Sequence, residues 1–277
     1  MNQITACLAA VLALSVSALG QDEPQQFATT SWHGLSGLYL VPTARTFRQG
    51  QLSLGYSESK HVEFLGSKRF NDRQVRGVLT YGVTDCVELT GTFYTNILDI
   101  ADQATPQFGN ENFSTVGLKV RVLQEKPGKW YPSVAIGVRD LFDNTRDVGA
   151  LDKVNNGRKW FLLASKRLKT NQQGRFLDGH LGLTNDEAET AGLVGFELAL
   201  TPITSFIAEG MWDAPYLNFR GIFHPTLQGR NDVPGRFVYT TGLRFYPDLI
   251  RGLAIDLGFL GDGQFEFAFG LSYTTGR

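Results

Sequence analysis

A period-two alternation of apolar and polar residues recurs along this chain and constrains its fold more than any other feature. In residues 115–122, TVGLKVRV, every second residue is Val or Leu, and Thr, Gly, Lys and Arg stand between them. A period of two places successive side chains on opposite faces of a β-strand. We find the pattern in twelve stretches: 51–60, 74–82, 86–94, 115–122, 133–139, 158–167, 176–183, 193–200, 204–212, 236–246, 252–259 and 264–273.

The alternation is less regular in three of these stretches. It is blurred at 158–167 and 204–212, where we expect a bulge in the second case, and Leu193 stands on the wrong face of its strand.

The segments between the stretches differ in length in a regular way. Short connections at 83–85, 125–129, 169–174, 201–204 and 247–251 alternate with longer polar ones at 61–72, 97–112, 142–157, 185–190 and 213–234. Short turns at one end and long loops at the other are typical of outer-membrane β-barrels. The sequence therefore predicts an all-β, transmembrane, antiparallel up-and-down barrel rather than a two-sheet sandwich. Twelve strands place both ends of the barrel on the periplasmic side. Fourteen are the alternative, if 217–223 and the N-terminal GLYLVP (37–42) add strands.

The N-terminus has the character of an export signal. Its apolar run ends near small residues before Gln21 and is shorter than the roughly 20 residues that a spanning helix needs. We expect residues 1–20 to be a cleaved signal peptide, residues 21–50 a Gly- and Pro-containing periplasmic segment able to plug the lumen, and residues 51–277 the barrel. After cleavage Cys86 is the only cysteine, so no intrachain disulfide is expected.

The two faces of the strands predict two environments. The apolar face is expected to meet lipid and lipopolysaccharide. Aromatic residues near the strand ends are expected in the headgroup zone: Tyr81, Trp130, Tyr131, Phe245 and Tyr246 at the short turns, and Tyr94, Phe142 and Trp212 at the long loops.

The polar face is expected to line the lumen. Its charged and titratable members are Glu88, Lys119, Arg121, Arg139, Asp178, His180, Glu197, Arg236, Arg244, Asp256 and Glu266. Acids and bases are mixed, which favours internal pairing over an ion-selective field and predicts a narrow or occluded lumen. His180 shares a face with Asp178 and is within reach of Asp256 or Glu197 across the lumen, and we interpret it as a polar member of an ion-pair network rather than a catalytic residue.

The start of the predicted barrel carries a family resemblance. Residues 34–45, GLSGLYLVPTAR, followed by RQGQLSLGYS (48–57), resemble the YjbH-like family of outer-membrane β-barrel proteins, and PSVAIGVRDLF (132–142) and LLASKRL (162–168) are also similar. The motif residues are Gly37, Pro42, Thr43, Ala44 and Arg45. The resemblance covers one barrel unit and implies a role in exopolysaccharide biosynthesis or secretion, with polysaccharide and periplasmic export components as partners.

The sequence favours a non-catalytic function. It contains no Gly-x-Ser-x-Gly, no His-Glu-x-x-His and no paired cysteines, so no catalytic residue, cofactor or metal is expected. Asp147 and Asp152 lie in a loop whose spacing fits no calcium template. A net charge of −1 argues against nucleic acid as a partner. We expect an outer-membrane protein, placed by the barrel-insertion machinery, that acts in exopolysaccharide secretion or the surface matrix. A passive small-solute channel is the alternative, and an outer-membrane hydrolase a remote one.

Overall fold

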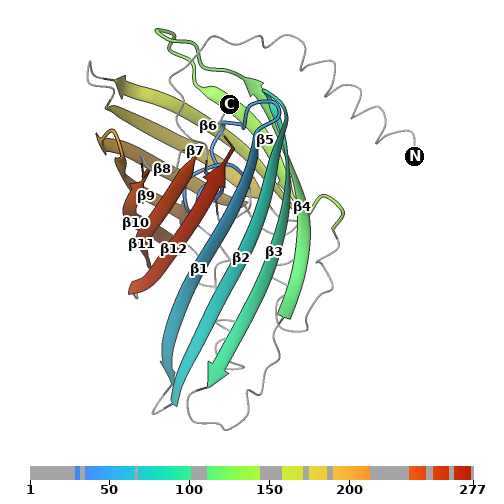
Figure 1. The fold of residues 1–277 in the computed structure, drawn as a ribbon, viewed down its shortest axis with the longest axis vertical. Coiled ribbons are helices and arrows are strands. Elements are labelled where there is room, and N and C mark those ends of the chain that lie inside the picture. Colours follow the sequence, from blue (N-terminus) through green and yellow to red (C-terminus); the bar gives the residue numbers. More distant parts are fainter. Residues whose placement is uncertain are drawn as a thin grey trace.

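A computed structural model describes most of the chain and shows a closed β-barrel (Figure 1). The described residues are 29–31, 35–65, 68–100, 111–143, 158–170, 175–185, 190–212, 237–247, 252–261 and 265–275. The predicted signal peptide, the 144–157 loop and the 217–223 stretch lie outside them.

The described strands number twelve, and each pairs antiparallel with its neighbours in chain order. They are β1 (Leu52–Leu65), β2 (Lys68–Thr84), β3 (Val87–Ile100), β4 (Glu111–Leu123), β5 (Ser133–Arg139), β6 (Lys159–Thr170), β7 (Phe176–Asn185), β8 (Thr190–Thr201), β9 (Thr204–Trp212), β10 (Phe237–Phe245), β11 (Leu253–Gly261) and β12 (Phe265–Thr274). The predicted twelve-stranded, up-and-down barrel is confirmed.

The first and last strands close the barrel. They pair from Ser53 opposite Thr274 to Lys60 opposite Phe267, and the pairing starts at the end of the barrel that carries the short connections. Residues 37–42 are not a further barrel strand, because Gly37 and Pro42 form an isolated bridge with each other. The GLYLVP part of the fourteen-strand alternative is therefore wrong.

The hairpin of β1 and β2 is longer than the sequence suggests. We expected a polar loop at 61–72, but the two strands stay in register as far as Leu65 opposite Lys68, so that prediction is wrong. β3 likewise runs to Ile100. Figure 1 shows β1, β2 and β3 extending well past the ends of β10, β11 and β12. A ladder held by backbone hydrogen bonds continues beyond the lipid, where no apolar face is needed and the alternation that marks a strand is lost.

The outward face is apolar, as a lipid-facing wall requires. Large apolar side chains are exposed on every strand whose side chains are described, among them Leu54, Leu79, Phe93, Leu162, Leu181, Phe259 and Phe267. The protein is thus an outer-membrane-type transmembrane barrel. Among the described residues no helix has the length and apolarity to cross a membrane.

The aromatic prediction is only partly right. Trp130, Phe142 and Trp212 are exposed near strand ends. Tyr94, however, is buried, and the Tyr246 hydroxyl donates to Glu197 at 3.1 Å. Position near a strand end does not decide facing, and these two side chains point inward.

The irregular strands have a common cause. Phe161, Leu163, Leu193, Ile207 and Met211 all point inward and are buried. β6 alternates in exposure from Lys159 to Lys166 and β9 from Thr204 to Glu209, but both faces of these strands carry apolar residues. The expected bulge in 204–212 is wrong: β9 pairs in unbroken register with β10, and the register shift lies in β8 between Ala199 and Thr201.

Candidate functional site

The barrel interior holds residues 29–31 and 35–47, which we call the lumenal segment. Leu35, Leu38, Leu40, Val41 and Phe47 are almost completely buried. Three of them, Leu35, Leu40 and Val41, share one core cluster with inward apolar side chains of β6, β8 and β9, which include Phe161, Leu163, Leu193 and Met211. The apolar interruptions of the alternation thus mark where this segment packs.

A tight hairpin forms the centre of the lumenal segment. The amide of Leu38 donates to the Val41 carbonyl at 2.9 Å, and the amide of Thr43 donates to the Ser36 carbonyl at 3.1 Å. The chain passes so close to itself that a Cβ on Gly37 would lie 2.5 Å from the Val41 carbonyl oxygen and 2.6 Å from the Pro42 Cα. Gly37 is therefore required by close backbone approach.

Glu88 and Lys119 form a buried ion pair that holds both arms of this hairpin. Their charged atoms are 3.1 Å apart, and both side chains are fully enclosed. Glu88 accepts from the amides of Ser36 at 2.8 Å and Phe47 at 3.2 Å. Lys119 donates to the carbonyls of Ser36 and Thr43, each at 2.9 Å. The pair thus satisfies the backbone groups that burial would otherwise leave unpaired.

Glu209 holds the tip of the hairpin from β9. Its carboxylate accepts from the amide of Leu40 at 2.9 Å and from that of Val41 at 2.7 Å. The alternation does not reveal Glu209, because apolar Ile207 and Met211 share its face. The one indication in the sequence is that a charged residue, Glu209, stands at period two between the apolar residues Ile207 and Met211.

The motif residues that follow Pro42 contact β6 and β7. The amide of Ala44 donates to the Ser165 hydroxyl at 2.8 Å. Arg45 forms an ion pair with Asp178 at 2.5 Å, and Arg167 pairs with the same carboxylate at 2.9 Å. Arg45 and Asp178, which the sequence singled out for different reasons, are thus brought together.

His180 lies in the lumen but not where we expected it. Its Nδ1 is 2.9 Å from the Ser165 hydroxyl, while Asp256 pairs with Arg244 at 2.6 Å and Glu197 lies 3.9 Å from Arg244. The contact of His180 with Asp256 or Glu197 that we considered within its reach is therefore not formed in the described part of the chain. Arg244 lies next to both acids instead: it stands directly opposite Asp256 in the pairing of β10 with β11, and Glu197 is close to the same guanidinium.

The other predicted lumen residues are placed as follows. Arg139 is buried beside Tyr94, and Arg121 is half-buried and donates to the Asp85 carbonyl at 2.8 Å. Arg236 and the side chain of Glu266 lie outside the described part. Two further cations, Arg76 and Lys159, are completely buried but were not among the lumen residues predicted from the sequence.

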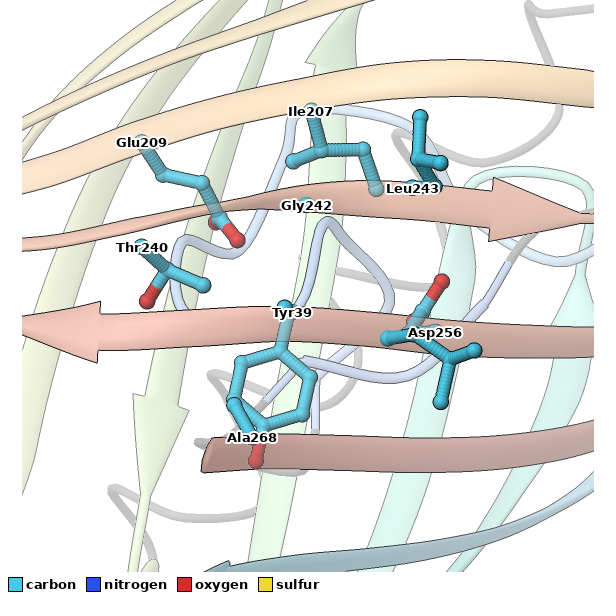
Figure 2. A pocket seen from close by; sticks show the side chains of 10 residues that line it. Tyr39, Ile207, Glu209, Thr240, Gly242, Leu243, Asp256 and Ala268 are labelled. Carbon is cyan, nitrogen blue, oxygen red and sulfur yellow. The ribbon is translucent and has the colours of Figure 1, made fainter. Parts of the chain in front are cut away.

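A small cavity remains between the hairpin and β9 to β12 (Figure 2). Its volume is about 10 Å³, the room of about one water molecule. Figure 2 shows Tyr39 reaching toward Ala268, with Glu209, Thr240 and Asp256 around the same space. Burial raises the pKa of the Tyr39 phenol, which stays protonated and donates to the Glu58 carbonyl at 3.1 Å. The described lumen is thus filled by the chain itself at this level.

The described residues show no group of His, Cys, Asp or Glu arranged to hold a metal ion. Ser165 and His180 are adjacent, but Ala44 covers Ser165, and the other ring nitrogen of His180 has no hydrogen-bond partner within the described part of the chain. A Ser–His pair without an orienting acid does not make an activated nucleophile.

Comparison with known proteins gives one family match and several distant structural likenesses. Residues 29–145 match the model of a family described as "Exopolysaccharide biosynthesis protein YbjH". No curated protein matches the chain in sequence.

Among solved structures, the COG4313 outer membrane channel from Pseudomonas putida F1 is 11% identical, with a TM-score of 0.47 over 92% of this chain and 99% of that one. The translocator domain of the autotransporter NalP from Neisseria meningitidis is 13% identical, with a TM-score of 0.41 over 81% and 88%. The transport unit of the autotransporter AIDA-I from Escherichia coli is 9% identical, with a TM-score of 0.37 over 97% and 96%.

The family match starts at the first described residue of the lumenal segment and runs through β1 to β5. It includes Gly37, the motif Pro42 to Arg45, and the Glu88–Lys119 pair, whereas Glu209, which holds the tip of the hairpin, lies outside it. Residues 29–145 of this twelve-stranded outer-membrane barrel thus match the YjbH exopolysaccharide-biosynthesis family model.

Proposed function

We propose that this protein is a non-catalytic outer-membrane barrel that acts in exopolysaccharide secretion or surface-matrix formation, and that the lumenal segment keeps its lumen closed at rest. The observation that carries the proposal is that the family-matched residues 29–145 contain both the hairpin and the Glu88–Lys119 pair that grips it. A segment so held by buried charges is a built part of the barrel, unlike the open water-filled lumen of a porin.

The mixture of charges in the lumen supports the same reading. Asp178 is paired with Arg45 and Arg167, Glu88 with Lys119, and Asp256 with Arg244. Paired charges give little net field to select a small ion. We further propose that lipopolysaccharide surrounds the barrel, that the insertion machinery places it, and that periplasmic export components meet its short-connection end.

Conductance in a planar bilayer tests the closed lumen. We expect the purified protein, once its heat-dependent migration on a gel shows that it is folded, to pass no steady current. A variant lacking residues 35–47 is expected to conduct if it migrates as a folded barrel. A steady open conductance of the unmodified protein would contradict the closed lumen and favour the passive channel.

Exopolysaccharide output tests the cellular role. We expect a strain without this protein to lose surface or secreted polysaccharide, and the intact chain to restore it. A matched complementation with Glu88→Ala and Lys119→Ala together should restore less, because the hairpin loses its main anchor. Unchanged polysaccharide in the deletion strain would overturn the proposed role.

A further inference from the structure

Two arginines share one tyrosine ring in the lumen, on the side of the long connections. Arg76 on β2 faces Tyr94 on β3 directly across the ladder, and Arg139 is the last residue of β5. The guanidinium carbons of Arg76 and Arg139 lie 4.6 and 4.7 Å from the Tyr94 ring centroid. All three side chains are buried.

β4, the strand between them, presents Thr115 and Gly117 on its lumen face at this level. The Leu35 side chain of the lumenal segment lies over Gly117. The cluster itself is built by side chains of β2, β3 and β5.

Arg139 is a buried cation with an unsatisfied donor. Its Nε is fully enclosed and has no hydrogen-bond partner in the described part of the chain. Two other buried cations differ: Lys119 pairs with Glu88, and Arg244 pairs with Asp256. Buried charges in proteins are normally paired in this way.

We propose that Arg139, with Arg76 and Tyr94, forms a subsite for the carboxylate of an acidic sugar in a polysaccharide. A guanidinium presents a planar fork of donors that matches a carboxylate, and the tyrosine ring holds both cations in place before the ligand arrives. The identity of the ligand as a saccharide rests on the proposed function, whereas the anion preference rests on the charges alone.

The lumenal segment covers this subsite. Arg76 donates to the Ser31 carbonyl at 3.5 Å, and the Leu35 side chain lies beside Gly117 and Gly137. A carboxylate that binds Arg76 must therefore displace the start of the lumenal segment. Ligand binding and opening of the segment are coupled, so a variant that loosens the segment binds more tightly.

Binding by the purified barrel in detergent tests the subsite, with tetragalacturonate as probe, maltotetraose as the neutral sugar and inorganic phosphate as the headgroup anion. We expect tetragalacturonate to bind, Arg139→Gln to weaken it at least tenfold, and Glu209→Ala to strengthen it. Lys126→Gln, which removes an exposed charge in a short connection, is the matched control and is expected to bind as the unmodified protein does. Each variant is first checked for heat-dependent migration.

Three results would overturn the proposal. They are equal binding by Arg139→Gln, no tetragalacturonate binding by either the unmodified protein or Glu209→Ala, and phosphate binding as tight as that of tetragalacturonate. These results are independent of cellular output: a strain that keeps its polysaccharide without this protein contradicts the proposed function and leaves measured carboxylate binding intact.

Discussion

The lumenal segment is held in place by hydrogen bonds from a few of its buried backbone amides. Glu209 accepts from two of them, at Leu40 and Val41, and nothing else in the described lumen is bonded to both. Arg45 is different, because Asp178 keeps Arg167 when Arg45 is lost. Charged residues of the lumen therefore differ in their effect on stability according to which buried groups their removal leaves unpaired.

Glu209→Ala is expected to free the hairpin tip, because two buried amides lose their acceptor at a cost of about 1–3 kcal/mol each. Arg45→Ala is expected to cost less than about 1 kcal/mol, since its pair is partly exposed and Asp178 stays neutralised. Hydrogen exchange of the 35–47 region measures both. Equal loss of protection in the two variants would contradict this ranking.

Gly37→Ala is expected to open the hairpin, because the new methyl group would lie 2.5 Å from the Val41 carbonyl oxygen. Overpacking of this kind costs typically about 1–3 kcal/mol. Gly91→Ala is the matched control, since a Cβ there meets nothing within 4 Å. Exchange in 35–47 should rise only in the first variant, and unchanged exchange in Gly37→Ala would show that the backbone adjusts.

At the scale of elements, β6, β8 and β9 serve the lumenal segment as well as the lipid. On β6, Leu163 is 1% exposed and packs in the core around the hairpin, while its neighbour Leu162 is 49% exposed and faces outward. The same residue type thus has two roles one position apart, which a period of two dictates. A strand with two apolar faces inside a barrel indicates a packed interior at that point.

Leu163→Ala is expected to cost about 2–5 kcal/mol, as for other buried leucines, and to loosen the segment enough to give transient current in a bilayer. Leu162→Ala removes a lipid contact and leaves the core intact, so this variant is expected to pass no current. Denaturation in detergent and bilayer recordings measure the two effects. Current from both variants or neither would contradict the division of faces.

At the scale of the whole molecule, closure and lipid contact depend on each other. β12 pairs with β1 and β11, so the barrel has no free edge within the described strands. A closed sheet satisfies every backbone group without water, which is what a bilayer demands. On one side of the barrel, β1, β2 and β3 extend beyond the ends of β10, β11 and β12, so their backbone pairing continues past the part that the bilayer covers.

Phe267→Arg is expected to destabilise the barrel in lipid vesicles by about 2–4 kcal/mol if the position lies at the midplane, because it puts a charge on the lipid face. Phe267 is 53% exposed on β12, whereas Trp130 is 88% exposed in a short connection. Trp130→Arg is the control and is expected to cost far less. Urea titration in vesicles gives both values, and equal effects would place Phe267 outside the lipid.

The sequence by itself determined the class, the strand number and the facing of most side chains. A period of two is a local property, set by the pleat, and it survives in regions such as 115–122 whatever surrounds them. The GLYLVPTAR stretch also pointed to the family and to a plug before any contact was known. The same local reasoning failed at 61–72, where the strands continue beyond the region that needs an apolar face. The headgroup prediction failed at Tyr94 for another reason: it used position near a strand end, whereas the pleat places this side chain inward.

Only the tertiary structure decided what fills the lumen. Arg45 meets Asp178 133 residues away, and Leu40 meets Glu209 169 residues away, so no spacing in the sequence pairs them. His180 likewise contacts Ser165, whereas Glu197 and Asp256 both lie next to Arg244. Facing follows from the pleat of one strand, whereas partners inside the barrel follow from the position of all twelve strands around the lumenal segment.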